Sequence, residues 1–220
     1  MIATAMIAAA FDPPRCTPTT YCPSDCAAAG YAPSAQPIQS ATVSLQGSSV
    51  GETQFQAAAA RAVAVARTFP GVTRDLLDGL HLSLVYECCY TSAELAQIGR
   101  LGAALVWAPI AVRFKRVACV GGAYLVLTDP ASQGALMGLA AALEDAMQTA
   151  GMRVHRFRAE EAPFHSSLFD QNSSYPTAEA VVAINKAMGS GWWNEEPITV
   201  TSFKLQGTNF TWHASETNVL

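Results

Sequence analysis

The chain has 220 residues, of which half are hydrophobic and 14% are charged, and its formal net charge is −4. This composition is typical of a globular protein and excludes disorder over most of the length, and no apolar run reaches the length of a membrane span. The acidic net charge provides no broad surface for long nucleic acid, so we expect a small nucleotide or an oligonucleotide end as the ligand. We also expect a monomer that does not bind a membrane.

Residues 1–39 are predicted to form an extended arm or linker. They are rich in Ala, Pro, Thr and Ser, and proline fixes φ and removes backbone donors. A targeting or partner-binding role for this arm is an open alternative. The folded domain is expected over residues 40–206, and residues 207–220 are interpreted as a frayed carboxy-terminal tail.

The cysteines leave the compartment open. Three lie in the arm, at Cys16, Cys22 and Cys26, in a spacing that matches no zinc pattern. The vicinal pair Cys88 and Cys89 is interpreted as ordinary core and edge residues of a strand. A disulfide framework is the alternative in a secreted protein, and two glycosylation sequons are weak support for it. The amino terminus lacks the basic region of a signal peptide, so the cytoplasm is favoured and secretion stays open.

Alternating and three-to-four residue periodicities predict the elements of the first half of the domain. In chain order these are a strand over 41–45, a helix over 53–68, a strand over 80–88, a helix from about 92, and a strand over 109–120. The last strand carries a polar kink at Lys115 and Arg116. Thr91 or Ser92 is expected to cap the second helix.

The second half repeats a strand and helix theme. Gly121 and Gly122 predict a hairpin turn. Beyond it we expect a strand over 124–128, a helix ending at Gly151, a strand over 152–158, a short strand at 165, a helix over 176–188 and a strand over 197–205. Ser132 or Asp129 is expected to cap the long helix. The order predicts an α+β fold of two pseudo-symmetric lobes, each with antiparallel sheet and helices, around a central cleft.

Two of the predicted strands share one pattern, His-x-Ser followed by leucine. The two copies are His81-Leu82-Ser83-Leu84 and His165-Ser166-Ser167-Leu168. Successive side chains of a strand point to opposite faces, so each strand presents an imidazole and a hydroxyl on one face, about 7 Å apart. If the strands are related by a rough two-fold axis, two imidazoles and two hydroxyls converge. Such a site suits a phosphate flanked by a general base and a general acid.

A third copy of the pattern, His213-Ala214-Ser215, is interpreted as chance. It lies in polar surroundings close to the end of the chain, whereas the other two copies lie in apolar runs. His-x-Ser alone is a weak signal, and its weight here comes from the matched pair at His81 and His165.

The paired motifs resemble those of the two-histidine (2H) phosphoesterase superfamily, which includes 2′,3′-cyclic nucleotide phosphodiesterases and 2′-5′ RNA ligase-like proteins. That family carries His-x-(Ser/Thr)-x-(apolar) on facing strands of two pseudo-symmetric lobes, and the resemblance covers about residues 40–206. It implies a metal-independent phosphoesterase acting on a cyclic or 2′-linked nucleotide or an RNA-end phosphodiester. His81 and His165 would be the catalytic acid and base, and Ser83 and Ser167 would bind the phosphate.

The sequence calls for no cofactor and no metal, since no cluster of His, Asp and Glu has ligand spacing. Histidine suits both proton transfers, and hydroxyls can donate to the phosphate oxygens. Phe169 and Trp192 are candidates for base stacking, as is the neighbouring Trp193, although packing is the favoured role for each.

Two further hypotheses are kept. A non-catalytic nucleotide or RNA-end binding module on the same fold would not require an acid and base pair. A secreted, cysteine-rich structural protein with fortuitous motifs would require disulfides among the arm cysteines.

Overall fold

The computed structural model describes residues 26–32, 34–69, 72, 75–120, 123–154, 164–169 and 178–215. Its helices are α1 (Val50–Ala66), the short 3₁₀ helix η1 (Leu77–Gly79), α2 (Ser92–Ala103), α3 (Pro130–Thr149) and α4 (Ala178–Met188). Its strands are β1 (Gln36–Ser44), β2 (His81–Tyr90), β3 (Ile110–Val112), β4 (Phe114–Val120), β5 (Ala123–Thr128), β6 (His165–Ser167), β7 (Ile198–Val200), β8 (Ser202–Leu205) and β9 (Thr211–His213). No helix among these described residues is long and apolar enough to cross a membrane.

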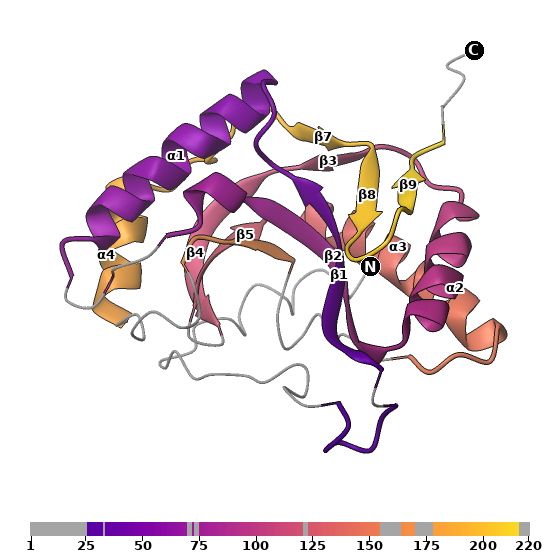
Figure 1. The fold of residues 1–220 in the computed structure, drawn as a ribbon. Coiled ribbons are helices and arrows are strands. Elements are labelled where there is room, and N and C mark those ends of the chain that lie inside the picture. The colour runs from indigo at the N-terminus through magenta and orange to yellow at the C-terminus, as the bar shows by residue number, and fades with distance from the viewer. Residues whose placement is uncertain are drawn as a thin grey trace, which may run out of the picture.

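The described strands form two main antiparallel sheets and a connecting ribbon (Figure 1). The first sheet has the order β2-β1-β8-β9, and the second has the order β4-β5-β6. Strands β3 and β7 pair with each other alone. The α+β class with antiparallel sheets that the element order predicted is therefore confirmed.

Two predicted strands each divide between sheets. The strand predicted over 109–120 is β3 followed, after Arg113, by β4, and the strand predicted over 197–205 is β7 followed, after Thr201, by β8. Because β3 and β7 pair antiparallel, β4 and β8 continue from opposite ends of the ribbon and enter different sheets. The ribbon therefore links the second sheet, through β4, to the first sheet, through β8.

The helices begin where side chains can satisfy the free N–H groups of the first turn. Ser49 with Glu52, and Thr91 with Glu94, form capping boxes at the starts of α1 and α2. Asp129 caps α3, where its Oδ1 accepts from the N–H groups of the first turn. The backbone N–H of Thr91 is the main reason that the pKa of the Glu94 carboxyl is lowered. Burial opposes this effect, and the Thr91 hydroxyl and Arg153 make smaller contributions that lower the pKa.

One hydrophobic core cluster includes residues from both main sheets and from α1 to α4. Phe55 of α1 stacks on Phe114 of β4 with ring centroids 4.2 Å apart, which anchors that helix on the second sheet. Leu82 and Leu84 of β2 point into the same cluster, as does Phe203 of β8. The inner face of each sheet is thus filled, and its other face is where polar side chains can lie.

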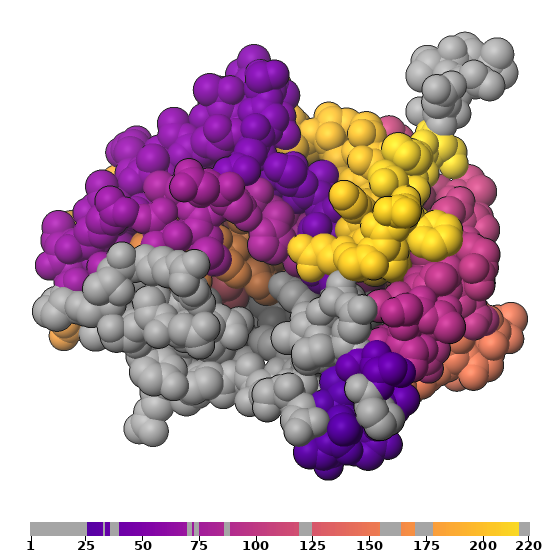
Figure 2. All heavy atoms as spheres, in the orientation of Figure 1, coloured from indigo at the N-terminus to yellow at the C-terminus, as the bar shows by residue number. Residues whose placement is uncertain are grey.

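The amino-terminal arm is more closely attached than the sequence predicted. Strand β1 already begins at Gln36, and a disulfide joins Cys26 to Cys89 at the end of β2. The interpretation of Cys89 as an ordinary strand residue is therefore wrong. The Arg153 guanidinium contacts the rings of Tyr31 and Tyr90, 4.2 and 4.7 Å from their centroids, and donates to the Cys89 carbonyl at 2.7 Å. Figure 2 shows this amino-terminal segment against the magenta surface around α2.

The predicted frayed tail is also wrong for the part of it that the structure describes. Strand β9 pairs with β8, and Trp212 within it is only 2% exposed. Its indole Nε1 donates to the Gly99 carbonyl at 3.0 Å. A Cβ at Gly102 would lie 2.1 Å from the same indole ring, so α2 carries glycine where the tryptophan packs. The fold therefore extends beyond 206.

Of the strand predicted over 152–158, residues 152–154 have no regular secondary structure and the remainder lies outside the described residues.

Candidate active site

The two His-x-Ser motifs lie on strands at the edges of their sheets. Strand β2 is the edge of the four-stranded sheet and β6 is the edge of the three-stranded sheet, and the two strands contact each other. The motifs are 84 residues apart in sequence (165 − 81), and their strands meet because the edges of the two sheets contact each other. The two strands that carry the motifs are therefore neighbours in the fold.

Backbone contacts immediately outside the motifs hold the two strands together. The N–H of Leu76 donates to the Leu168 carbonyl at 3.0 Å, and Asp75 forms an isolated antiparallel bridge with Phe169. Leu76 lies five residues before His81, and Leu168 directly follows Ser167. The segment that precedes the first motif is therefore hydrogen-bonded to the residues that follow His165-Ser166-Ser167 in the second.

His81 has a defined ring orientation. Its Nδ1 lies 2.7 Å from the Gly79 carbonyl oxygen. A carbonyl oxygen only accepts, so Nδ1 carries the proton and Nε2 is the nitrogen left to exchange a proton with a ligand. Gly79 ends η1, so this short helix sets the orientation of the imidazole through its last carbonyl.

Ser83 is buried and its hydroxyl has no protein partner. The residue is 5% exposed, and Oγ makes no hydrogen bond. The register pairs it with Thr42 of β1, while Leu82 beside it points into the core. An unpaired buried hydroxyl costs about 1–3 kcal/mol, a cost that an accepting ligand oxygen would offset.

The second motif shows the same alternation. His165 and Ser167 of β6 are half-buried, and Ser166 between them is fully buried. The register pairs His165 with Leu127 and Ser167 with Leu125, whereas Ser166 pairs with Val126, which belongs to the core cluster. His165 and Ser167 therefore share the face that points away from the core. The Ser166 hydroxyl also lacks a partner, but on the core side.

A glutamine of α3 holds the residue before His165. Gln133 Nε2 donates to the Phe164 carbonyl at 2.7 Å, and the Phe164 N–H donates to Gln133 Oε1 at 2.9 Å. The Thr128 hydroxyl also donates to that carbonyl, at 3.4 Å. This side-chain amide continues the backbone ladder where the short strand β6 begins, and it fixes the backbone that enters His165.

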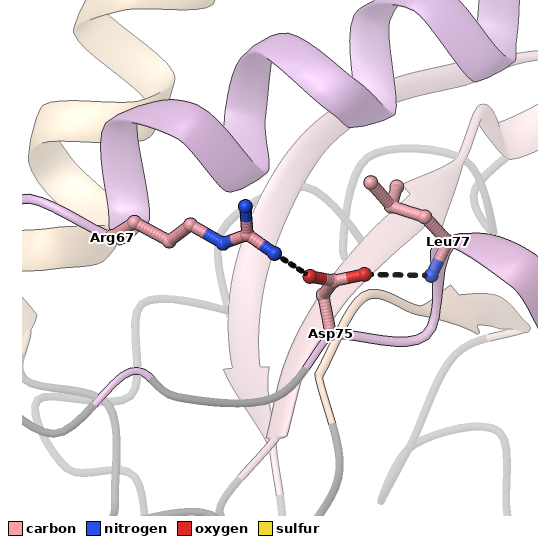
Figure 3. A network of polar contacts seen from close by, with 3 residues as sticks. All are labelled: Arg67, Asp75 and Leu77. Carbon is pink, nitrogen blue, oxygen red and sulfur yellow. Dashed lines mark hydrogen bonds and ion pairs between the residues drawn. The ribbon is translucent and has the colours of Figure 1, made fainter.

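Asp75 supports the approach to the first motif (Figure 3). One carboxylate oxygen pairs with Arg67, the C-cap residue that follows α1, and the other accepts from the N–H of Leu77 at 3.2 Å. Leu77 begins η1, whose last carbonyl holds His81. A connected path thus runs from the end of α1 to the imidazole. Neither Asp75 nor Gln133 gave a signal in the sequence, because each lies outside the motifs and acts on the backbone of a residue near one.

The two candidates for base stacking lie in different surroundings. Phe169 is 3% exposed and belongs to the core cluster, which favours packing as its role. Trp192 is half-buried at the edge of β4, with Arg113 and Lys115 over its ring. Trp193 is buried, and its backbone N–H donates to the Phe114 carbonyl at 2.8 Å. The loop containing both tryptophans therefore packs along β4.

His213, of the third motif copy, lies on β9 at the opposite edge of the four-stranded sheet from β2. Three strand spacings, about 14 Å, separate the two edges. Its side chain is exposed. Among the residues that the structure describes, no group of three or more His, Cys, Asp or Glu side chains could hold a metal ion.

No family model matches the chain, and no curated protein matches it. Solved structures do share its fold. E. coli LigT complexed with NADP⁺ is 14% identical with a TM-score of 0.52, covering 83% of this chain and 99% of LigT. TT0787 of Thermus thermophilus is 18% identical with a TM-score of 0.51, covering 76% of this chain and 86% of its own.

A protein described as a phosphoesterase is 14% identical with a TM-score of 0.50, covering 82% of this chain and 94% of its own. LigT has also been solved with 3′-AMP and with phosphate. The chain therefore has the LigT fold over most of its length, and the resemblance that the two motifs indicated is confirmed at the level of the fold.

Proposed function

We propose that this protein is a phosphoesterase that opens a 2′,3′-cyclic phosphate or cleaves a related 2′-linked or RNA-end phosphodiester. His81 and His165 exchange protons with the reacting oxygens, and Ser83 and Ser167 bind the phosphate. The observation that carries the proposal is the contact between β2 and β6, each of which presents one His-x-Ser pair on the face away from the core. The buried, unpaired hydroxyl of Ser83 is the donor that a phosphate oxygen would satisfy.

The proposed chemistry balances without a further reactant. Water attacks phosphorus and loses its proton to one imidazole, while the bond from phosphorus to a ribose oxygen breaks and the other imidazole protonates that oxygen. Because the Gly79 carbonyl holds Nδ1–H of His81, the proton exchanges at Nε2 in either role. One imidazole must be neutral and the other protonated, so kcat/KM should be bell-shaped in pH.

The comparison with LigT supports the class of ligand. LigT structures hold nucleotides and phosphate, and this chain shares their fold over most of its length. A nucleotide carrying a phosphodiester is the simplest ligand that uses both the hydroxyl donors and the acid and base pair. A binding module would need only the hydroxyls, so turnover is the property that separates the two hypotheses.

The decisive experiment is a substrate panel assayed in excess EDTA. It contains 2′,3′-cyclic mononucleotides, a 2′-5′ linked dinucleotide, ADP-ribose cyclic phosphate and an oligonucleotide that ends in a 2′,3′-cyclic phosphate. We expect turnover of at least one substrate that survives chelation and is abolished by His81→Ala and by His165→Ala. Binding of these ligands without turnover would establish the non-catalytic module instead, and activity that requires an added divalent metal would refute the proposed mechanism.

A further inference from the structure

Three of the thirteen lysines and arginines of this acidic chain occur within four residues, Arg113-Phe114-Lys115-Arg116. Their arrangement in the structure differs from that of a solvated charge run. Phe114 and Val117 are buried in the core, whereas Lys115 and Arg116 are exposed and Arg113 is half-buried. All three cations therefore lie on the face of β4 that points away from the core.

A β-bulge brings two of the cations onto the same face. The pairing of β4 with β5 runs from Phe114 opposite Thr128 to Arg116 opposite Leu127, so Lys115 is the extra residue. Two residues of a bulge oppose one on the partner strand, and both then project from one side of the sheet. The polar kink predicted at this position from the sequence is confirmed as this bulge.

The same face carries the second motif. Leu127 of β5 is in register with Arg116 on one side and with His165 on the other. Arg116 and His165 are thus two strand spacings apart, about 10 Å between backbones, with side chains on the same face. Leu125 and Leu127 form the apolar strip between them, and they are buried without belonging to the main core cluster.

An aromatic ring completes the group. Trp192, half-buried in the loop beside β4, has the Lys115 ammonium 5.0 Å and the Arg113 guanidinium 5.8 Å from its ring centroid. The ion pairs recorded among the described residues do not include Arg113 or Lys115, and Arg113 Nε is buried without an acceptor. Glu195 and Glu196 follow in the same loop as exposed carboxylates. We refer to Arg113, Lys115, Arg116 and Trp192 as the β4 patch.

We propose that the β4 patch binds the continuing strand of an oligonucleotide whose terminal phosphodiester occupies the His and Ser site. Cations that follow a backbone, with an aromatic side chain on which a base can stack, are the features that bind single-stranded nucleic acid without sequence preference. The chain's net negative charge argues against a broad electrostatic surface, but a short strand needs only this local one. The inference rests on the proposed function and narrows its substrate to an oligonucleotide end.

The test compares substrates of increasing length. We would measure kcat/KM for a 2′,3′-cyclic mononucleotide and for oligonucleotides of two, four and eight nucleotides that end in the same cyclic phosphate. The expected result is a rise in kcat/KM with length that disappears as salt is raised. A wild-type protein that turns over the mononucleotide with no gain from length overturns the β4 patch and leaves the proposed function standing. Absence of turnover on every substrate overturns the proposed function itself.

Variants then assign the length effect to the patch. Lys115→Gln/Arg116→Gln should reduce kcat/KM for the eight-nucleotide substrate roughly tenfold and leave that for the mononucleotide within about twofold. Arg61→Gln/Lys186→Gln is the matched control, because it removes the same charge from exposed positions of α1 and α4. An equal loss from the control, or an equal loss on the mononucleotide, would refute the proposal.

A measurement on the unmodified protein covers the case in which a variant does not fold. The affinity of a fluorescent eight-nucleotide strand with a plain 3′-hydroxyl should fall with salt, with a slope near −2 in log–log form for about three phosphate contacts. Salt-independent binding would contradict a cationic patch. An acidic peptide that displaces this strand as effectively as a second oligonucleotide would show that the occupant is a protein segment instead.

Discussion

The two motif strands carry the same residues but are supported in different ways. Strand β2 has ten residues, and its His81 is oriented by a carbonyl two residues earlier in the same chain segment. Strand β6 has three residues, and the backbone before His165 is held by the side chain of Gln133, 32 residues away (165 − 133). The first site is therefore largely built from local contacts, and the second depends on contacts across the fold.

The serines of the two motifs also differ, in how deeply they are buried. Ser83 is buried with an unpaired hydroxyl, whereas Ser167 is half-buried. A group that is costly in the empty protein and useful with a ligand is typical of a binding site prepared before the ligand arrives. The comparison teaches that the symmetric roles predicted from the motifs rest on an asymmetric scaffold, and the following predictions test that asymmetry.

The largest expected effect is at the histidines. His81→Ala and His165→Ala should each lower kcat by about 10²–10⁴-fold, the usual contribution of one general acid or base. His213→Ala is the matched control, because it removes an exposed imidazole at the far edge of the first sheet. Steady-state kinetics on the best substrate of the panel provide the measurement. A loss from His213→Ala as large as that from His165→Ala would mean that the wrong pair has been chosen.

The serines should separate activity from stability. Ser83→Ala and Ser167→Ala should each lower kcat by roughly 10²–10³-fold, as removal of one transition-state donor does. Ser83→Ala removes a buried hydroxyl that bonds to nothing, so the free energy of unfolding should stay equal or rise. Denaturant unfolding beside the kinetics checks both. A clear loss of stability in Ser83→Ala would show that its hydroxyl has a structural partner after all.

Loss of the disulfide should lower the stability of the protein and leave its catalytic rate nearly unchanged. Cys26→Ser opens the bond to Cys89 and should lower the free energy of unfolding by about 2–4 kcal/mol. Cys89 lies eight residues along β2 from His81 (89 − 81), roughly 25 Å of extended chain, so kcat should change little. Mass spectrometry after alkylation without reductant tests the bond itself. Disulfides persist in oxidising compartments, so an intact bond in the native protein would favour the secreted alternative over the cytoplasm.

The smallest expected effect concerns the residues that hold the backbone near each motif strand. Gln133→Ala removes both bonds to Phe164 and should cost about 1–3 kcal/mol of stability, with faster amide hydrogen exchange at Phe164 and a lower kcat at nearly unchanged KM. Gln46→Ala is its counterpart beside the first motif, where one exposed bond to the Leu77 carbonyl is lost, and it should cost under about 1 kcal/mol. Equal effects of the two substitutions would contradict the asymmetry.

The sequence alone determined the motif pair, the α+β class and most of the elements. Each of these follows from local rules, because alternation along a strand and periodicity along a helix depend only on neighbouring residues. It also located the bulge at Lys115 and Arg116, where two adjacent polar residues interrupt an otherwise apolar strand. The rejection of His213 rested on the same kind of evidence, since its surroundings are polar while those of the other copies are apolar.

Only the tertiary structure decided which distant residues meet. The disulfide between Cys26 and Cys89 joins an arm to a strand end, and no spacing in the sequence specifies that pairing. Trp212 looked like part of a polar tail because its partners, Gly99 and Gly102, lie more than a hundred residues earlier. Gln133 and Phe164 lie 31 residues apart, and Arg113 and Trp192 lie 79 residues apart (192 − 113). Their positions are set by how the sheets and helices pack, which local periodicity does not encode.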